Sequence, residues 1–128
     1  MIFDTSSLVK ILTEGEVEKL FDEKILDLTF YETGNVFWKM HNLQNRIEKE
    51  ELAELIKLID RLEKEMEAIR PDREKVMKIA SKHEITLYDA SYLTTAKEAG
   101  EKLATEDSEL AEVAEEEGVE ITDTEELN

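Results

Sequence analysis

Four acidic residues stand at places in the chain where carboxylates commonly hold metal ions. Asp4 follows the apolar start "MIF", Asp89 lies in "TLYDASYL", and Asp107 lies in "TEDSEL". Each stands where a short apolar segment gives way to a predicted helix, and Glu32 lies in the opening turn of another predicted helix. Several oxygen donors without sulfur suit a hard cation, so this set predicts a site for Mg²⁺ or Mn²⁺.

Asp89 is the acid whose charge is hardest to explain, because its neighbours are leucine, tyrosine and alanine. Lys82 is the only lysine or arginine within seven residues on either side. A partly desolvated carboxylate without a neighbouring cation is costly. Either the start of its helix satisfies Asp89, or a cation that the sequence does not encode binds there.

Each acid taken alone also has a structural interpretation. Aspartate is a favoured N-cap, and this interpretation is the stronger one for Asp107. Both interpretations stay open for Asp4 and Asp89. Glutamate in a first helical turn suits the helix dipole, but the segment around Glu32, "LTFYETGNVFW", is too apolar for an ordinary solvated face. The four acids together favour a site over four separate caps.

The elements that would position these acids alternate between short apolar strands and helices. Strands are expected at 1–3, 25–30, 66–71, 101–105 and 119–122, and helices at 5–12, 16–23, 31–44, 48–67, 71–83, 85–100 and 107–118. This alternation predicts one helix-rich α/β domain over residues 1–128, a three-layer α/β/α sandwich with a short parallel sheet of four to five strands. Ligands of such sheets bind beyond the carboxyl ends of the strands, where the acids are expected.

Composition narrows the functional classes. The 128 residues contain no cysteine, which excludes disulfides, thiol catalysis and zinc–thiolate sites. There is no apolar run of membrane-spanning length and no secretion signal, which favours a cytoplasmic protein without a membrane partner. Charged residues make up 38% of the chain, and a composition so rich in Glu and Lys resembles that of heat-adapted proteins.

The net charge of −17 is unevenly distributed along the chain. Residues 83–128 carry two basic and fifteen acidic residues, whereas residues 39–82 carry eleven basic and ten acidic residues. Phosphate binding needs positive surface, so any path for nucleic acid has to run over the middle third.

Four segments carry a resemblance to a known family, the PIN-domain nucleases and specifically the small VapC-type toxins. "MIFDTSSLVK" resembles the opening strand of the family, with its first acid Asp4 and a serine, Ser6, two residues later. "YETGNVFWK" is similar to the Glu-x-x-Asn motif and supplies Glu32 and Asn35. The remaining two segments, "ITLYDASYLTTAKEAG" and "KLATEDSELAEVAEEEGVEI", supply Asp89 and the pair Thr105 and Asp107.

The resemblance implies an endoribonuclease that depends on Mg²⁺ or Mn²⁺ and hydrolyses RNA with a metal-activated water. Its implied catalytic and metal-binding residues are Asp4, Glu32, Asp89 and Asp107, the last acting directly or through water, and its implied orienting residues are Ser6, Asn35 and Thr105. It also implies a small antitoxin partner and a homodimer. Apolar side chains near one helix, those of Phe37, Trp38 and Met40, are candidates for the core or for a dimer contact.

Other functions remain as alternatives. A PIN nuclease could act in RNA maturation or quality control, or the fold could serve as a non-catalytic binding module. A phosphoacceptor receiver would need an adjacent acidic pair after the first strand and a lysine after the last one, whereas Thr5 and Ser6 follow Asp4 and no lysine follows Lys102. The histidines His41 and His83 lie away from the strand-end motifs and are expected to be structural or exposed residues. The cations Lys10, Lys39 and Arg46 could contact phosphate or could be ordinary surface residues.

Overall fold

The computed structural model describes residues 1–14 and 16–127 and contains a five-stranded parallel sheet. The strands are β1 (Ile2–Phe3), β2 (Lys24–Leu26), β3 (Glu67–Ile69), β4 (Leu103–Ala104) and β5 (Ile121–Thr122). Their order across the sheet is β3-β2-β1-β4-β5, and every pair is parallel. The strand nearest the N-terminus therefore lies in the middle of the sheet.

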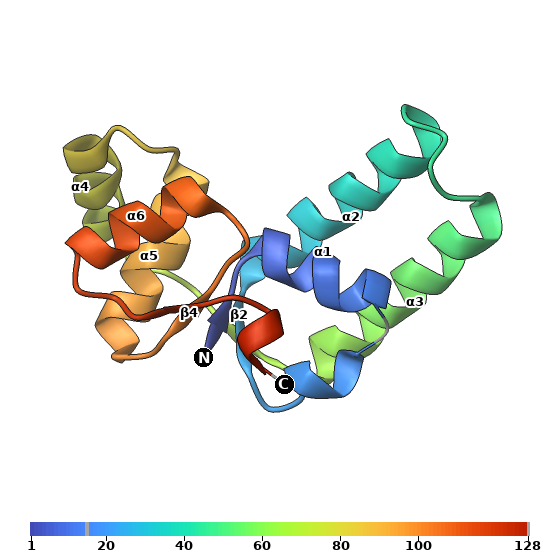
Figure 1. Ribbon diagram of the computed structural model, residues 1–128, viewed down its shortest axis with the longest axis horizontal. Helices are drawn as coiled ribbons and strands as arrows, with labels where there is room; N and C mark the ends of the chain where they lie inside the picture. The colour runs from blue at the N-terminus through green and yellow to red at the C-terminus, as the bar shows by residue number, and fades with distance from the viewer. Residues whose placement is uncertain (15, 128) are drawn as a thin grey trace.

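Helices cover both faces of this sheet (Figure 1). The helices are α1 (Thr5–Glu14), α2 (Asp27–Asn42), α3 (Lys49–Glu65), α4 (Arg73–His83), α5 (Leu87–Ala99) and α6 (Ser108–Glu116), with the 3-10 turns η1 (Val17–Leu20) and η2 (Glu125–Leu127). The first three helices lie on one side of the sheet and the last three on the other, and α2 and α3 extend away from it as a pair (Figure 1). The predicted three-layer α/β/α sandwich is confirmed.

Two apolar cores follow from the alternation of side chains along the strands. Phe3 belongs to a core shared with α1 and α3, and its neighbour Ile2 belongs to a core shared with α5 and α6. Successive strand residues point to opposite faces, so the two residues of β1 anchor one layer each. Because β1 is fully buried on both faces, the residue that follows it is held firmly.

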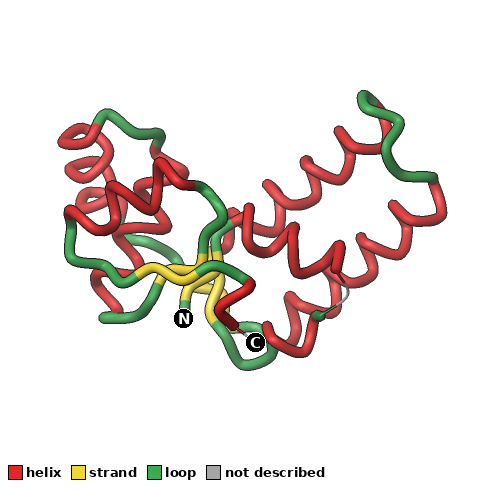
Figure 2. Tube along the Cα trace, in the orientation of Figure 1, coloured by secondary structure: helices red, strands yellow, loops and turns green. Residues whose placement is uncertain are grey.

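The carboxyl ends of all five strands meet at one edge of the sheet, where the yellow strands give way to green loops and red helices in Figure 2. From β1 the chain winds outward through β2 to β3 and then returns to the other side of β1 as β4 and β5. The reversal lies between β1 and β4, which is where open α/β sheets bind their ligands. Asp4 directly follows β1, and Thr105 directly follows β4.

One predicted element is wrong in type. Residues 25–30 were expected to form a strand, but β2 ends at Leu26 and α2 begins at Asp27. Thr29, Thr33 and Phe37 are fully buried at a spacing of four residues, so the apolar character of this segment belongs to one face of a helix. The segment at 16–23 contains the 3-10 turn η1 rather than an α-helix. The other predicted strands and helices are present with shifted ends.

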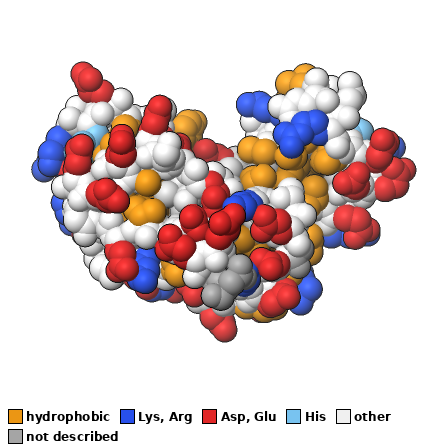
Figure 3. All heavy atoms as spheres, viewed as in Figure 1, with side chains coloured by type: hydrophobic (Ala, Val, Ile, Leu, Met, Phe, Trp, Pro, Cys, Tyr) orange, Lys and Arg blue, Asp and Glu red, His pale blue; other side chains and the backbone are white. Residues whose placement is uncertain are grey.

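Within residues 1–14 and 16–127, no helix has the length and apolar character needed to cross a membrane. Acidic side chains are scattered over the face seen in Figure 3, and apolar side chains line the notch between the two arms of the molecule.

Candidate active site

Asp4 is buried and is held by a set of short hydrogen bonds. Its side chain is 4% exposed. Its Oδ1 accepts from Ser6 Oγ at 2.7 Å and from the Ser7 backbone N–H at 2.9 Å, and its Oδ2 accepts from the Thr105 hydroxyl. Burial raises the pKa of Asp4, and the hydrogen bonds from Thr105, Ser7 and Ser6 oppose that rise. The result is a fixed carboxylate whose charge the surrounding protein only partly compensates.

Thr105 and Ser6 connect Asp4 to the segment that carries Asp107. The Thr105 hydroxyl accepts from the Asp107 backbone N–H at 3.0 Å, and Ser6 Oγ accepts from the Glu106 backbone N–H at 3.0 Å. Asp107 caps α6, since its Oδ1 accepts from two backbone N–H groups of the first helical turn. The predicted capping role of Asp107 is therefore present, and its second carboxylate oxygen accepts no hydrogen bond from the part of the chain that the structure describes.

Glu32 is held by residues that the sequence did not single out. Its Oε1 accepts from Tyr92 Oη at 2.7 Å and from Thr5 Oγ1 at 3.0 Å. Tyr92 Oη also lies 2.7 Å from Thr29 Oγ1 and 2.9 Å from Thr5 Oγ1. Burial is the main cause that raises the pKa of Tyr92 above its ordinary range, so this hydroxyl stays protonated and donates a hydrogen bond to Glu32.

Asp89 lies in the first turn of α5, half-buried. The Thr86 hydroxyl caps this helix by accepting from the Asp89 backbone N–H at 3.1 Å. Burial raises the pKa of the Asp89 carboxylate, and the charges of Asp107, Asp4 and Glu32 raise it further, in that order. The charges of the other three acids therefore reach Asp89, although the four residues span 103 positions of the sequence.

The cluster of Asp4, Glu32, Asp89 and Asp107, called the acid cluster below, has no protein cation of its own. None of its members forms an ion pair within residues 1–14 and 16–127. Mutual repulsion among partly desolvated carboxylates is relieved by a bound cation, and oxygen donors suit Mg²⁺ or Mn²⁺. The donor set fits such a metal, although across the described ranges no three acidic or histidine side chains already form a ready coordination group.

Comparison with known protein families shows which family the chain belongs to. The profile of the PIN domain family matches residues 1–116. This chain belongs to the PIN domain family.

Two curated proteins from Pyrobaculum aerophilum are similar to this PIN domain. One, named Exonuclease VapC9, is 36% identical over 86 residues, which span 67% of this chain and 62% of that protein. The other, named Ribonuclease VapC3, is 33% identical over 103 residues, which span 77% of this chain and 76% of that protein. These relatives confirm the predicted VapC type.

The fold is also similar to a solved structure, the crystal structure of PAE2754 from Pyrobaculum aerophilum. The TM-score is 0.79 at 27% sequence identity, and the match covers 98% of this chain and 90% of that one. The fold of that protein is therefore shared over nearly the whole chain.

Of the three orienting residues implied by the resemblance, two contact an acid of the cluster and one does not. Ser6 and Thr105 both donate to Asp4, as described above. Asn35 lies on α2 one turn beyond Glu32, is exposed, and makes no side-chain hydrogen bond within the described chain. Thr5 and Tyr92 are contacts that sequence reasoning missed. The available signal was a tyrosine three residues after Asp89, on the apolar side of the same helix.

His41, His83 and Lys10 all have partners within the protein. His41 Nδ1 lies 2.9 Å from the Ile47 carbonyl oxygen, which closes the turn after α2. His83 pairs with Glu117 in a buried ion cluster between α4 and α6. Lys10 pairs with Glu106 at 3.4 Å, and Glu106 also accepts from the Thr124 backbone N–H and hydroxyl. Glu106 is thereby turned toward the C-terminal segment.

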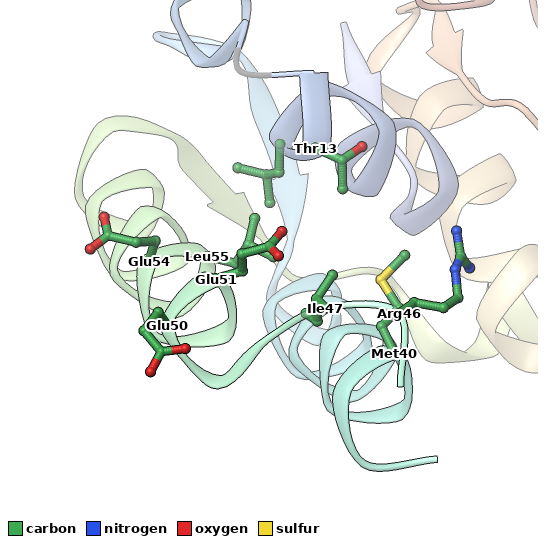
Figure 4. A pocket seen from close by; sticks show the side chains of 9 residues that line it. Thr13, Met40, Arg46, Ile47, Glu50, Glu51, Glu54 and Leu55 are labelled. Atoms are coloured by element: carbon green, nitrogen blue, oxygen red, sulfur yellow. The ribbon is translucent and has the colours of Figure 1, made fainter. Parts of the chain in front are cut away.

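A separate hollow of about 560 Å³ opens between α1, α2 and α3 (Figure 4). Met40, Ile47 and Leu55 supply apolar lining, and Glu50 and Glu54 supply acidic groups. No member of the acid cluster lines it. The chemistry proposed below therefore belongs to the sheet edge and not to this hollow.

Proposed function

We propose that this protein is a metal-dependent endoribonuclease that hydrolyses RNA phosphodiester bonds and acts as the toxin of a toxin–antitoxin pair. The observation that carries the proposal is the acid cluster: the charges of three carboxylates act on Asp89 at the switch point of the sheet, and none of the four acids pairs with a protein cation among the described residues. The similarity to proteins named as a ribonuclease and an exonuclease supports a nuclease.

The acids would hold Mg²⁺ or Mn²⁺. Asp4, Glu32 and Asp89 would bind the ion, with Asp107 supporting it directly or through water. A divalent cation at this place would supply an activated water and would neutralise charge that develops on the phosphate. The protein supplies rigidity, since Ser6, Ser7 and Thr105 fix Asp4, and Tyr92 fixes Glu32.

The substrate proposed is single-stranded or loop RNA. Residues 83–128 carry fifteen acidic against two basic residues, so phosphate is repelled from the surface that they form. Attraction comes from the metal and from the basic residues of the middle third, 39–82. Binding is therefore expected to weaken with salt and to strengthen with metal.

Two protein partners belong to the proposal. A small antitoxin with a basic segment would compete with RNA at the acid cluster, because the carboxylates attract its positive charge and repel phosphate. The protein itself would be a homodimer. Trp38, which is 46% exposed, can contribute to a dimer contact, whereas Phe37 is fully buried in the core and contributes no surface.

RNA cleavage tests the enzymatic part of the proposal. Purified protein is incubated with a mixed RNA pool in Mn²⁺ or in EDTA, beside the variant Asp4→Asn. We expect cleavage by the wild type in Mn²⁺ alone. Cleavage that persists in EDTA or in the variant would contradict the proposed mechanism. Growth of cells that express the protein, with and without the adjacent small gene product, tests the toxin role separately.

A further inference from the structure

A second hollow, of about 360 Å³, lies beside the acid cluster at the same edge of the sheet. Its lining includes Asp27, which begins α2 just after β2, and Arg70, which follows β3. Tyr88, which directly precedes Asp89 in α5, also lines it. The carboxyl ends of β3, β2 and β1 follow one another across the sheet, so the hollow continues the edge that carries Asp4. Two strand spacings of about 4.8 Å separate β3 from β1.

The hollow combines two arginines with an apolar surface. Arg70 and Arg73 both line it, both are exposed, and neither has a carboxylate within ion-pair distance in the described ranges. The ion pairs of the described chain are formed by lysines, the N-terminus and His83, so the charge of both arginines is available to an anionic ligand. Beside the arginines, Leu87 is 48% exposed and Tyr88 is 58% exposed.

We propose that this hollow, called the arginine hollow below, binds the nucleotide of single-stranded RNA next to the bond that is cleaved. Arg70 and Arg73 would hold its phosphate, and Tyr88 with the neighbouring Leu87 would hold its base. Unpaired guanidinium groups match phosphate geometry, and aromatic rings stack on any base. The proposal rests on the proposed ribonuclease function, because it names a substrate subsite of the same acid cluster.

Charge favours RNA over a second copy of this chain as the occupant. A symmetric contact between two copies at this place would bring the arginines of both copies together, and each copy carries a net charge of −17. RNA instead offers an anion to the arginines. Asp27 places a carboxylate in the hollow on the side of β2 and so keeps the phosphate on the side of β3. Its Oδ1 accepts from the Leu28 backbone N–H at 2.9 Å.

Binding of a fluorescein-labelled single-stranded RNA of mixed sequence, measured by anisotropy in EDTA, tests the arginine hollow without cleavage. The double variant Arg70→Ala, Arg73→Ala should lose about 0.7 from the slope of log affinity against log salt, since one neutralised phosphate of a single strand contributes about −0.7 to that slope. Tyr88→Ala should bind on the order of tenfold more weakly at all salt concentrations.

Two control variants remove the same number of positive charges, or one exposed aromatic side chain, outside the arginine hollow. Lys49→Ala combined with Lys64→Ala removes two cations of α3 that have no ion pair in the described chain. Trp38→Ala removes an exposed aromatic residue outside the arginine hollow. All of these positions are exposed, and thermal unfolding shows whether each variant is folded.

Several results would overturn the proposal. The proposal is wrong if the arginine variant has the same RNA affinity and the same salt slope as the lysine variant. It is also wrong if the wild type does not bind RNA. A change of mass in sedimentation without a change in RNA affinity would assign the hollow to a contact between copies. Failure of the ribonuclease function is separate: RNA would bind through the arginines, but Mn²⁺ would produce no cleavage.

Discussion

Replacing Tyr92 by phenylalanine removes one hydroxyl group from the acid cluster without opening a cavity. This hydroxyl lies within 3.0 Å of three oxygen atoms, those of Glu32, Thr29 and Thr5, and the Tyr92 side chain is 2% exposed. A hydrogen bond to a charged group contributes about 1.5–3 kcal/mol, and a buried hydroxyl left without a partner costs about 1–3 kcal/mol. Because these two losses overlap, we expect the free energy of unfolding to fall by about 2–3 kcal/mol.

The same substitution should weaken metal binding, because Glu32 Oε1 loses a donor that fixes its orientation. Loss of a group that orients a metal ligand typically costs about 10-fold to 100-fold in affinity. Titration of Tyr92→Phe with Mn²⁺ by calorimetry should therefore give a dissociation constant raised by that factor. Thermal unfolding in EDTA should show a melting temperature lowered by roughly 10 °C for a domain of this size.

Thr29→Val is the matched control. Thr29 Oγ1 is fully buried, and its partner is Tyr92 Oη and not Glu32. This variant should lose stability on the same order of magnitude and keep its affinity for Mn²⁺. If Tyr92→Phe and Thr29→Val lose stability alike and both bind Mn²⁺ as the wild type does, Tyr92 only stabilises the core and does not position Glu32.

Three further predictions concern charge and assembly. Asp89→Asn should raise the melting temperature in EDTA at neutral pH, because the raised pKa of Asp89 means that folding favours its protonated form. This gain should vanish at acidic pH, where the wild-type carboxyl is also protonated. A lower melting temperature of the variant at neutral pH would refute the repulsion. Glu117 is 4% exposed and lies 2.8 Å from Lys82 and 2.7 Å from Lys97, and these lysines with His83 lower its pKa from 4.5 to about 2. Its contribution to stability is present above pH 4.5 and is lost as the pH falls toward 2, so acid titration of stability should show this loss in the wild type and not in Glu117→Gln. Sedimentation at micromolar concentration should give twice 14.8 kDa, and a monomer at high protein concentration would contradict the proposed dimer.

Helices with local end signals could be predicted well from the sequence. Asp72 caps α4 through bonds to two backbone N–H groups, and Gly100 ends α5 with a φ of 65°. Both signals act within one turn of the chain, so they are readable without knowledge of the tertiary structure. The segment at 25–30 was misread because a buried helical face and a buried strand are both apolar over so few residues.

The candidate site also contains residues that could be predicted from the sequence and residues that could not. Asp4 could be placed at the site because it follows a strand and parallel strands end at one edge, whereas Ser6 and Thr105 were placed through the family resemblance. The bonds of Tyr92 to Glu32 and to Thr5 join residues 60 and 87 positions apart in the sequence. Such bonds depend on how α5 packs against the sheet, which no local pattern encodes.

The central claim is that the acid cluster binds a divalent cation, and titration of the wild type and Asp89→Asn with Mn²⁺ by calorimetry tests it most directly. Asp60→Asn, which removes an exposed carboxylate of α3, is the control for the loss of one charge. We predict saturable binding by the wild type and by Asp60→Asn, and loss of binding by Asp89→Asn. Equal affinity in all three proteins would contradict the acid cluster as a metal site.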